Sequence, residues 1–272
     1  MDRPGRPADS ASQVVLAAGG VRVLVDPADG GRMTSLAIGG VEVLAARGSG
    51  VIDHGSFVMA PWAGRIRDGL LRVGAAEHRL PTDRTHPHAG HGLVMDRSWR
   101  VLSSDPNRLV MRCDLDHRWP FAGHVLHELR LAPDRLTQRI ELHAEEVEFP
   151  ATVGWHPWFP RRLAGVPARL ALVAEGLLVR DSAGIPSGEV VAIPPGPWDD
   201  CFVGPQWPIT ITWPGVLSLQ IDSDVGFAVV YDELDVAFCV EPQSGPPDGP
   251  NTTPRMVRPG EPLVASTVWA WT

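Results

Sequence analysis

The chain has 272 residues and a formal net charge of -8 at pH 7, which argues against a nucleic-acid partner or an anionic membrane surface, because neither polyanion gains from meeting an acidic protein. All 24 of its basic residues are arginines, so a Schiff-base lysine and a P-loop lysine are both excluded. Hydrophobic residues make up 44% of the chain, enough for a substantial core, whereas 28 glycines and 27 prolines interrupt long helices.

The predicted elements are almost all strands, because apolar residues recur with a period of two far more often than with the period of a helix. Residues 1–12 carry charges with no hydrophobic region after them, so we expect a flexible leader rather than a signal peptide. The strands expected after it are, in chain order, Val21–Val25, a hairpin from Met33 to Leu44 closed at Gly39-Gly40, Trp99–Leu102, Leu109–Leu115, Val125–Leu131, Leu136–Leu142, Leu170–Val173, Ile209–Trp213, Leu217–Ile221, Phe227–Tyr231 and Val264–Trp271. No convincing helix of three turns and no internal repeat is found. Residues 13–272 are therefore predicted to form a single all-β domain, a large antiparallel β-sandwich.

The three cysteines, Cys113, Cys201 and Cys239, are odd in number and far apart, which favours reduced thiols over a disulfide framework or a zinc knuckle. No segment of the sequence is apolar for long enough to span a bilayer. We therefore expect a cytoplasmic protein with no membrane partner, either a monomer or a homodimer.

Two segments place a titratable side chain in apolar surroundings. His156 lies within residues 154–159 (GWHPWF), and Glu241 begins residues 241–251 (EPQSGPPDGPN). Apolar neighbours can shift pKa values, and a histidine with a distant carboxylate is the minimum equipment for general acid and base catalysis. A proton-transfer enzyme is the leading hypothesis.

Three further polar segments complete a series in a characteristic order. Residues 59–69 (MAPWAGRIRDG) and 90–94 (GHGLV) precede GWHPWF, and residues 199–202 (DDCF) lie between GWHPWF and EPQSGPPDGPN. In this order and at this spacing, the five segments resemble those of the aldose 1-epimerase family, the galactose mutarotase-like proteins. The resemblance covers roughly residues 15–271 and implies that the β-sandwich is the supersandwich of that family.

The resemblance also implies roles for individual residues. His156 takes the family's general-acid position, and Glu241 takes its general-base position. Asp199 is preferred to Asp200 as a sugar ligand because only Asp199 has the D-x-x-F spacing to Phe202. The positions implied to bind the substrate are Arg65, His91, Asp199, Gln243 and Trp158.

The implied reaction is the interconversion of the α and β anomers of an aldose, with the small-molecule sugar as the partner. A proton is delivered to the ring oxygen, another is taken from the anomeric hydroxyl, and the ring recloses after rotation about C1–C2. An imidazolium and a carboxylate supply both transfers, so neither a cofactor nor a metal is expected. Arg65 can donate to two vicinal oxygens and Asp199 can accept from a hydroxyl. Trp62, Trp158 and Phe159 could supply an apolar face for sugar C–H groups, whereas tryptophans taken one by one are more often packing and rim residues.

Each assignment has a structural alternative. His156 could be a core histidine among aromatic residues, and Arg65 and Asp199 could form an exposed ion pair of little energetic value. Residues 86–91 (HPHAGH) have ligand-rich spacing, but the proline and the lack of a nearby carboxylate make a metal centre hard to build there. We expect His86 and His88 to be loop residues around a sugar-binding His91.

Departures from the family pattern leave the substrate open. Gly64 stands where the family often has Asn, and Trp155 and Trp158 replace the commoner Asn and Tyr, so galactose or glucose is not simply implied. One alternative is a phosphorylated hexose, bound by some of Arg67, Arg72, Arg161 and Arg162. A second is a carbohydrate-binding or sensing protein without catalysis. A third, a sugar-processing lyase, usually needs a tyrosine or a metal, and Tyr231 is the only tyrosine.

Overall fold

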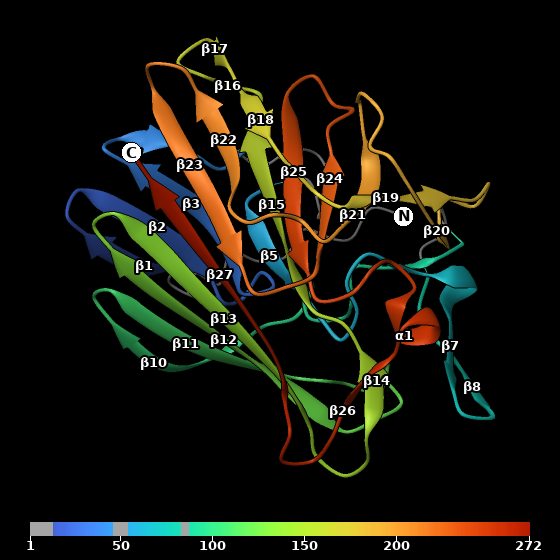
Figure 1. The fold of residues 1–272 in the computed structure, drawn as a ribbon. Coiled ribbons are helices and arrows are strands. Elements are labelled where there is room, and N and C mark those ends of the chain that lie inside the picture. Colours follow the sequence, from blue (N-terminus) through green and yellow to red (C-terminus); the bar gives the residue numbers. More distant parts are fainter. Residues whose placement is uncertain (1–12, 46–53, 83–86) are drawn as a thin grey trace, which may run out of the picture.

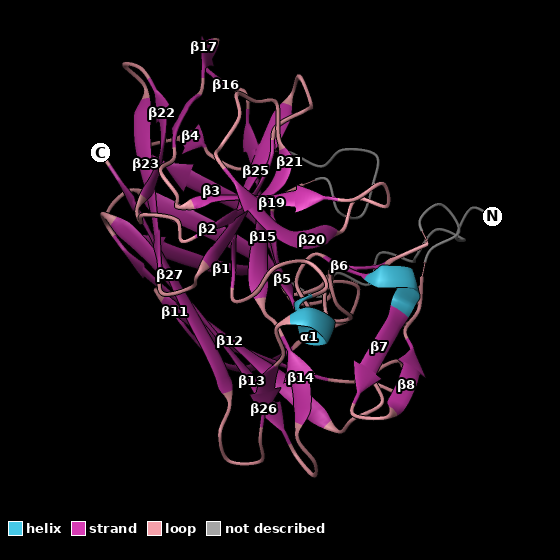
Figure 2. Cartoon of the chain, turned by 45° about the vertical axis from the view of Figure 1, so that its right-hand side comes forward, coloured by secondary structure: helices cyan, strands magenta, loops and turns pink. Residues whose placement is uncertain are grey.

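Two large antiparallel sheets account for most of the chain (Figure 1). The computed structural model describes residues 13–45, 54–82 and 87–272, so the predicted leader at residues 1–12 lies outside the described residues. Within these ranges, helix is limited to one turn of α-helix, α1 (Gly249–Thr252), and one 3-10 turn, η1 (Arg67–Gly69) (Figure 2). No described helix has the length and apolar character needed to cross a membrane. The prediction of an all-β antiparallel fold is confirmed.

Among the described residues, the larger sheet has 11 strands in the order β1-β2-β3-β5-β15-β25-β24-β21-β19-β20, with β4 paired beside β3. Its strands are β1 (Val14–Ala18), β2 (Val21–Asp26), β3 (Arg32–Ile38), β4 (Val41–Glu42), β5 (Ser56–Met59), β15 (Gly154–Pro160), β19 (Gly176–Arg180), β20 (Pro186–Val191), β21 (Asp199–Val203), β24 (Phe227–Tyr231) and β25 (Ala237–Gln243).

In the part of the chain that the structure describes, the smaller sheet has 8 strands in the order β10-β11-β12-β13-β27-β23-β22-β18. Its strands are β10 (Arg100–Asp105), β11 (Arg108–Asp114), β12 (Gly123–Ala132), β13 (Arg135–Ala144), β18 (Arg169–Ala171), β22 (Ile209–Trp213), β23 (Leu217–Ser223) and β27 (Leu263–Trp271). Short two-stranded ribbons complete the described fold: β6 (Arg65–Ile66) with β9 (Ala89–Gly90), β7 (Leu70–Val73) with β8 (Ala76–Arg79), β14 (Phe149–Ala151) with β26 (Arg255–Val257), and β16 (Arg162–Leu163) with β17 (Val166–Pro167).

The strands predicted from alternation are all present, with ends that differ by about three residues at most. Alternation is clearest in β12 and β13, where every second side chain is buried and the others are partly or fully exposed. β15 and β25 were not predicted as strands, because nearly all of their residues are buried and their sequences show no alternation.

The two sheets pack face to face around the main hydrophobic core. Phe159 of β15 and Trp269 of β27 lie with ring centroids 5.5 Å apart, and the indole of Trp213 on β22 donates to the Pro160 carbonyl at 3.2 Å. Successive side chains in a strand point to opposite faces. The face of β15 that carries Phe159 is therefore the core face, and the face that carries His156 points away from the smaller sheet.

Candidate active site

The floor of the site is the face of the larger sheet that points away from the core. On β15, Gly154 is paired with Gln243 of β25 and Trp158 is paired with Cys239, so His156 lies opposite Glu241 between these two pairs. When one face of a strand is buried in the core and the other face is buried in a site, neither face carries the exposed polar residues that make a strand alternate. This explains why both catalytic candidates occur in continuous apolar runs.

A row of side chains crosses this face from strand to strand. On one side of the His156–Glu241 pair, β5 places Phe57 opposite His156. On the other side, β24 places Val229 opposite Glu241, and β21 places Cys201 opposite Val229. The antiparallel register therefore brings together residues that are far apart in the sequence.

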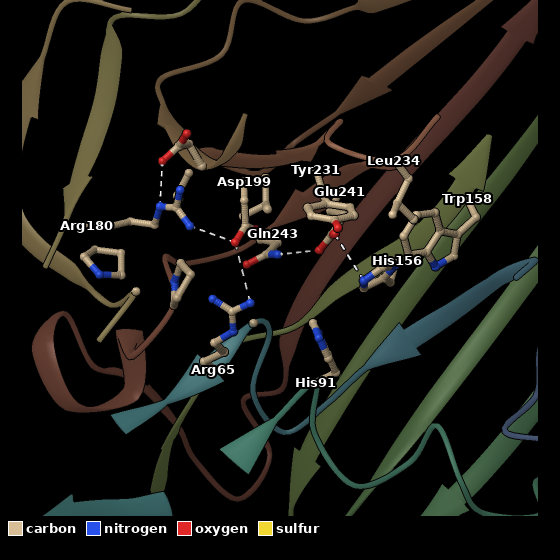
Figure 3. Close-up of a pocket in the computed structure, with 17 residues that line it drawn as sticks. Arg65, His91, His156, Trp158, Arg180, Asp199, Tyr231, Leu234, Glu241 and Gln243 are labelled. Atoms are coloured by element: carbon tan, nitrogen blue, oxygen red, sulfur yellow. Dashed lines mark hydrogen bonds and ion pairs between the residues drawn. The ribbon is translucent and has the colours of Figure 1, made fainter. Parts of the chain in front are cut away.

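A cavity of about 320 Å³ opens above this row (Figure 3). Figure 3 shows the side chains of Arg180 and Asp199 at one end, Trp158 and Leu234 at the other, and Glu241 between them. All seven residues predicted for the site line the cavity: His156, Glu241, Arg65, His91, Asp199, Gln243 and Trp158.

The catalytic candidates form a buried pair. His156 Nε2 lies 3.2 Å from Glu241 Oε1, and the two side chains are only 5% and 3% exposed. Burial raises the pKa of Glu241 to about 8, partly opposed by a hydrogen bond that Gln243 donates to Oε2 at 2.9 Å. Burial also lowers the pKa of His156 well below its usual value, and nearby His91 and Arg32 add to this effect. Near neutral pH the pair therefore shares one proton rather than holding two or none.

Two arginines and two aspartates form the polar end of the cavity. Arg180 donates from Nη1 to Asp199 Oδ2 at 2.8 Å and from Nε to Asp200 Oδ1 at 2.9 Å. Arg65 Nη2 lies 3.6 Å from the same Asp199 oxygen. The ion pair considered as an alternative for Arg65 and Asp199 is thus present, and both residues also line the cavity. The two positive and two negative charges balance.

His91 is aimed at the pair by a tight connection after β9. Its N–H donates to the Gly64 carbonyl at 2.7 Å, its backbone has a φ of 56°, and its ring meets His156 edge-on at 4.9 Å. Gly92, which follows, has a φ of 76°, and a Cβ there would lie 2.2 Å from the Ala60 carbonyl oxygen. Only glycine fits this close approach.

The segment after β25 orients Arg65. The Asp248 N–H donates to the Arg65 carbonyl at 2.6 Å, and Asp248 Oδ1 accepts from the Arg67 N–H at 3.1 Å. Asn251 Nδ2 donates to the same Asp248 oxygen at 2.7 Å. The PDGPN part of the sequence series therefore fixes the backbone that carries Arg65, and neither Asp248 nor Asn251 lines the cavity.

Two of the three aromatic residues expected to face the sugar do not do so. Trp62 stacks on Trp119 at 5.8 Å and donates to the Ala89 carbonyl at 3.2 Å, and Phe159 packs in the core. That part of the prediction was wrong, because strand parity and loop packing, rather than proximity in sequence, decide which ring faces the cavity. Trp158 alone of the three lines it.

The four arginines considered for phosphate also lie outside the cavity lining. Each donates or pairs elsewhere, to an acidic side chain or a backbone carbonyl: Arg67, Arg72, Arg161 and Arg162. Sequence reasoning missed Arg180, which ends β19 without a recognisable motif, and Leu234, which lies in the loop after β24. It named Tyr231 only for a lyase, and Tyr231 enters the cavity because it is paired with Asp199 across β21 and β24.

The histidines of residues 86–91 do not share one site. His86 lies outside the described residues. His88 accepts from the Asp68 N–H at 3.0 Å through Nδ1 and donates from Nε2 to the Ala183 carbonyl at 2.9 Å. His91 belongs to the cavity. The two hydrogen bonds of His88 therefore connect two loops.

Among the described residues, one group combines three potential metal ligands, namely His156, Cys239 and Glu241. Cys239 Sγ lies 3.6 Å from Nδ1 of His156, whereas Glu241 Oε1 lies 3.2 Å from Nε2. A histidine binds a metal through one ring nitrogen along its lone pair, and the thiol and the carboxylate lie beside different nitrogens. This arrangement suits hydrogen bonding better than coordination, and the expectation that no metal takes part stays a prediction.

Comparison with known proteins places the chain among its relatives. A sequence profile of the family described as aldose 1-epimerase matches residues 13–268. The chain belongs to the aldose 1-epimerase family. The resemblance found from the five sequence segments is therefore confirmed. A search of curated proteins finds no match.

Solved structures share the fold of this family member at low sequence identity. A candidate aldose 1-epimerase from Escherichia coli K12 has a TM-score of 0.85 at 18% identity, covering 96% of this chain and 99% of that one. A galactose mutarotase-like protein from Clostridium acetobutylicum has a TM-score of 0.82 at 18% identity, covering 95% and 94%. Galactose 1-epimerase from Lactobacillus acidophilus NCFM has a TM-score of 0.81 at 15% identity, covering 98% and 97%. At such identities, the likeness establishes the supersandwich fold.

Proposed function

We propose that the protein is a mutarotase that interconverts the α and β anomers of an uncharged aldose. The observation that carries this proposal is the His156–Glu241 pair, 3.2 Å apart and buried at the floor of a cavity of about 320 Å³. That volume is at the low end for ligand pockets, which suits a single sugar ring. Membership of the aldose 1-epimerase family supports the same reaction class.

In the proposed reaction, the proton shared by the pair moves from Glu241 to His156 when the sugar binds, so ring opening begins with Glu241 ionised and His156 protonated. The Glu241 carboxylate takes the proton of the anomeric hydroxyl while His156 Nε2 donates its proton to the ring oxygen, and the C1–O5 bond breaks to give the open aldehyde. Both side chains of the pair are now uncharged. After rotation about C1–C2, His156 takes the proton back from the C5 hydroxyl, the oxygen attacks the other face of C1, and Glu241 returns its proton to the carbonyl oxygen.

The electrostatics of the site support this cycle. Burial disfavours both charged forms, raising the pKa of Glu241 and lowering that of His156. The neutral pair, which also exists after ring opening, is therefore the state of the resting site, and the ion pair that starts ring opening forms by proton transfer from Glu241 to His156 across 3.2 Å. The pKa of Glu241, about 8, lies near a neutral operating pH, where a group can both give and take a proton effectively.

The balance of charge favours an uncharged sugar over a phosphorylated one. Arg65 and Arg180 are the arginines of the described cavity lining, and both contact Asp199. A phosphate group would have to displace a carboxylate, because charge-assisted binding requires positive charge that is not already paired. The hydroxyls of a sugar can instead accept from the arginines and donate to the aspartates without breaking those pairs.

The experiment that tests the proposal is NMR measurement of anomer exchange across a panel of free and phosphorylated aldoses. Glu241→Gln and His156→Asn are each expected to lower kcat by at least about a hundredfold, the lower end for loss of a general acid or base. Sugar binding should largely survive, because both replacements keep a polar group of similar size. Glu189→Gln and His117→Asn, the same changes at exposed positions, serve as matched controls.

The outcomes separate the possible functions. If Glu241→Gln exchanges anomers at the wild-type rate on every sugar that the wild type accelerates, the assignment of acid and base is wrong. If the wild type binds sugars and accelerates none, a carbohydrate-binding protein replaces the enzyme. Faster exchange of phosphorylated than of free aldoses would overturn the preference for an uncharged substrate.

A further inference from the structure

Cys239 is a buried thiol beside the catalytic pair that the reaction described above does not use. It lies on β25 two residues before Glu241, so both side chains point to the same face of the sheet. Cys239 Sγ lies 3.6 Å from Nδ1 of His156, within the range of a sulfur hydrogen bond, and Cys239 is 0% exposed. The thiol therefore contacts the ring nitrogen that does not face Glu241.

The three side chains, with Gln243, form a continuous chain of polar contacts. It runs from Cys239 Sγ to His156 Nδ1, from His156 Nε2 to Glu241 Oε1 at 3.2 Å, and from Glu241 Oε2 to Gln243 Nε2 at 2.9 Å. Phe57 stacks on the imidazole face with ring centroids 4.7 Å apart and an interplanar angle of 17°. The imidazole is thus held at both nitrogens and on one face.

Resting on the proposed function, we propose that Cys239 is a positioning residue whose sulfur accepts the Nδ1–H of His156, so that the exchanging proton is always the one on Nε2. In the catalytic cycle, Nε2 must give up its proton to the ring oxygen and then take it back. This requires the neutral imidazole to keep its hydrogen on Nδ1, and an acceptor beside Nδ1 favours that tautomer.

The weakness of sulfur as an acceptor suits this role. An ionised carboxylate beside Nδ1 would stabilise the imidazolium strongly and hold the proton on His156. Burial raises the pKa of the Cys239 thiol well above its usual value, so the group stays uncharged. A neutral thiol orients the ring and selects the tautomer, while the proton shared by His156 and Glu241 remains mobile.

The test compares Cys239→Ala, which removes the acceptor, with Cys239→Ser, which keeps one. For Cys239→Ala, kcat should fall about tenfold while KM changes by less than about twofold, the range for removal of a group that orients a reacting side chain. The alkaline limb of the kcat profile should move to lower pH, because the imidazolium loses an acceptor. Cys239→Ser should restore kcat to within about threefold of the wild-type value and restore the alkaline limb of the kcat profile to its wild-type pH.

Cys113→Ala is the matched control, because Cys113 is also buried, with 2% of its surface exposed, but lies on β11 in the other sheet. A role in packing alone predicts a different pattern. A hydroxyl in a buried apolar position would then destabilise the fold at least as much as a methyl group does, and neither variant would move the pH profile. The proposal is overturned if folded Cys239→Ser is as slow as Cys239→Ala, or if Cys239→Ala keeps the wild-type kcat and profile.

A second measurement does not depend on activity. In protein labelled with ¹⁵N-histidine, the His156 ring resonances should report a hydrogen on Nδ1 in wild type and Cys239→Ser, and its loss or a tautomer mixture in Cys239→Ala. If the wild type exchanges no anomers but carries the Nδ1–H, the proposed function fails and the role of Cys239 stands. If the neutral wild-type ring carries its hydrogen on Nε2, the role of Cys239 fails whatever the activity.

Discussion

Replacing Glu241 by glutamine should stabilise the folded protein at neutral pH while abolishing efficient catalysis. Glu241 is 3% exposed, and burial raises its pKa to about 8 from an unperturbed value of 4.5. The unfolded chain releases the proton of this carboxyl above about pH 4.5, whereas the folded protein retains it up to about pH 8. Stability is therefore lost as the pH rises between these values. Glutamine has the shape of the protonated acid and no such dependence.

The magnitude follows from the two pKa values. Suppressing ionisation in the folded state costs about 1.4 kcal/mol per pH unit within this window. Between pH 5 and pH 7.5, the stability advantage of Glu241→Gln over wild type should grow by about 3 kcal/mol, equivalent to a rise of roughly 6–12 °C in relative Tm for a chain of this size. The depressed pKa of His156 acts in both proteins, so it largely cancels in the difference.

The assay is urea unfolding of wild type and Glu241→Gln at pH 5 and pH 7.5, with exposed Glu189→Gln as the control. The control should track wild type at both pH values, because its carboxyl is solvated in the folded and the unfolded chain. If the difference between wild type and Glu241→Gln is the same at both pH values, Glu241 is ionised in the folded protein. The account of a neutral buried pair would then be refuted.

Two further predictions concern the residues that surround the pair. Arg65→Ala should raise KM about tenfold with a smaller loss in kcat, because a positioning contact serves ground and transition states alike. Steady-state kinetics measure both constants, and Arg72→Ala is the control because Arg72 lies outside the cavity lining. Gly92→Ala should lower the unfolding free energy by more than about 2 kcal/mol, because its Cβ would meet the Ala60 carbonyl at 2.2 Å. Gly74→Ala, with a φ of 59° and nothing within 4 Å, should lose only about 1 kcal/mol in the same urea titration.

The sequence alone determined the fold class and seven of the residues that line the cavity. Strands such as β12 and β13 have one buried and one more exposed face, so their alternation is visible in the residues themselves. Those seven residues were predicted from five short segments in a fixed order, and the match over residues 13–268 confirms the family that the segments indicated. In one of these segments the backbone itself requires a particular residue, because Gly92 has a positive φ and lies against the Ala60 carbonyl.

Only the tertiary structure decided how those residues are arranged and where the proton resides. Trp158 and Phe159 are neighbours in one apolar run, yet one lines the cavity and the other the core, and no alternation marks the difference in a strand buried on both faces. Arg180 and Cys239 enter the site through strand pairing, which involves residues distant in sequence. The pKa values of Glu241 and His156 are set mainly by burial. Burial is a property of the assembled sheets and loops, so no local segment of sequence contains it.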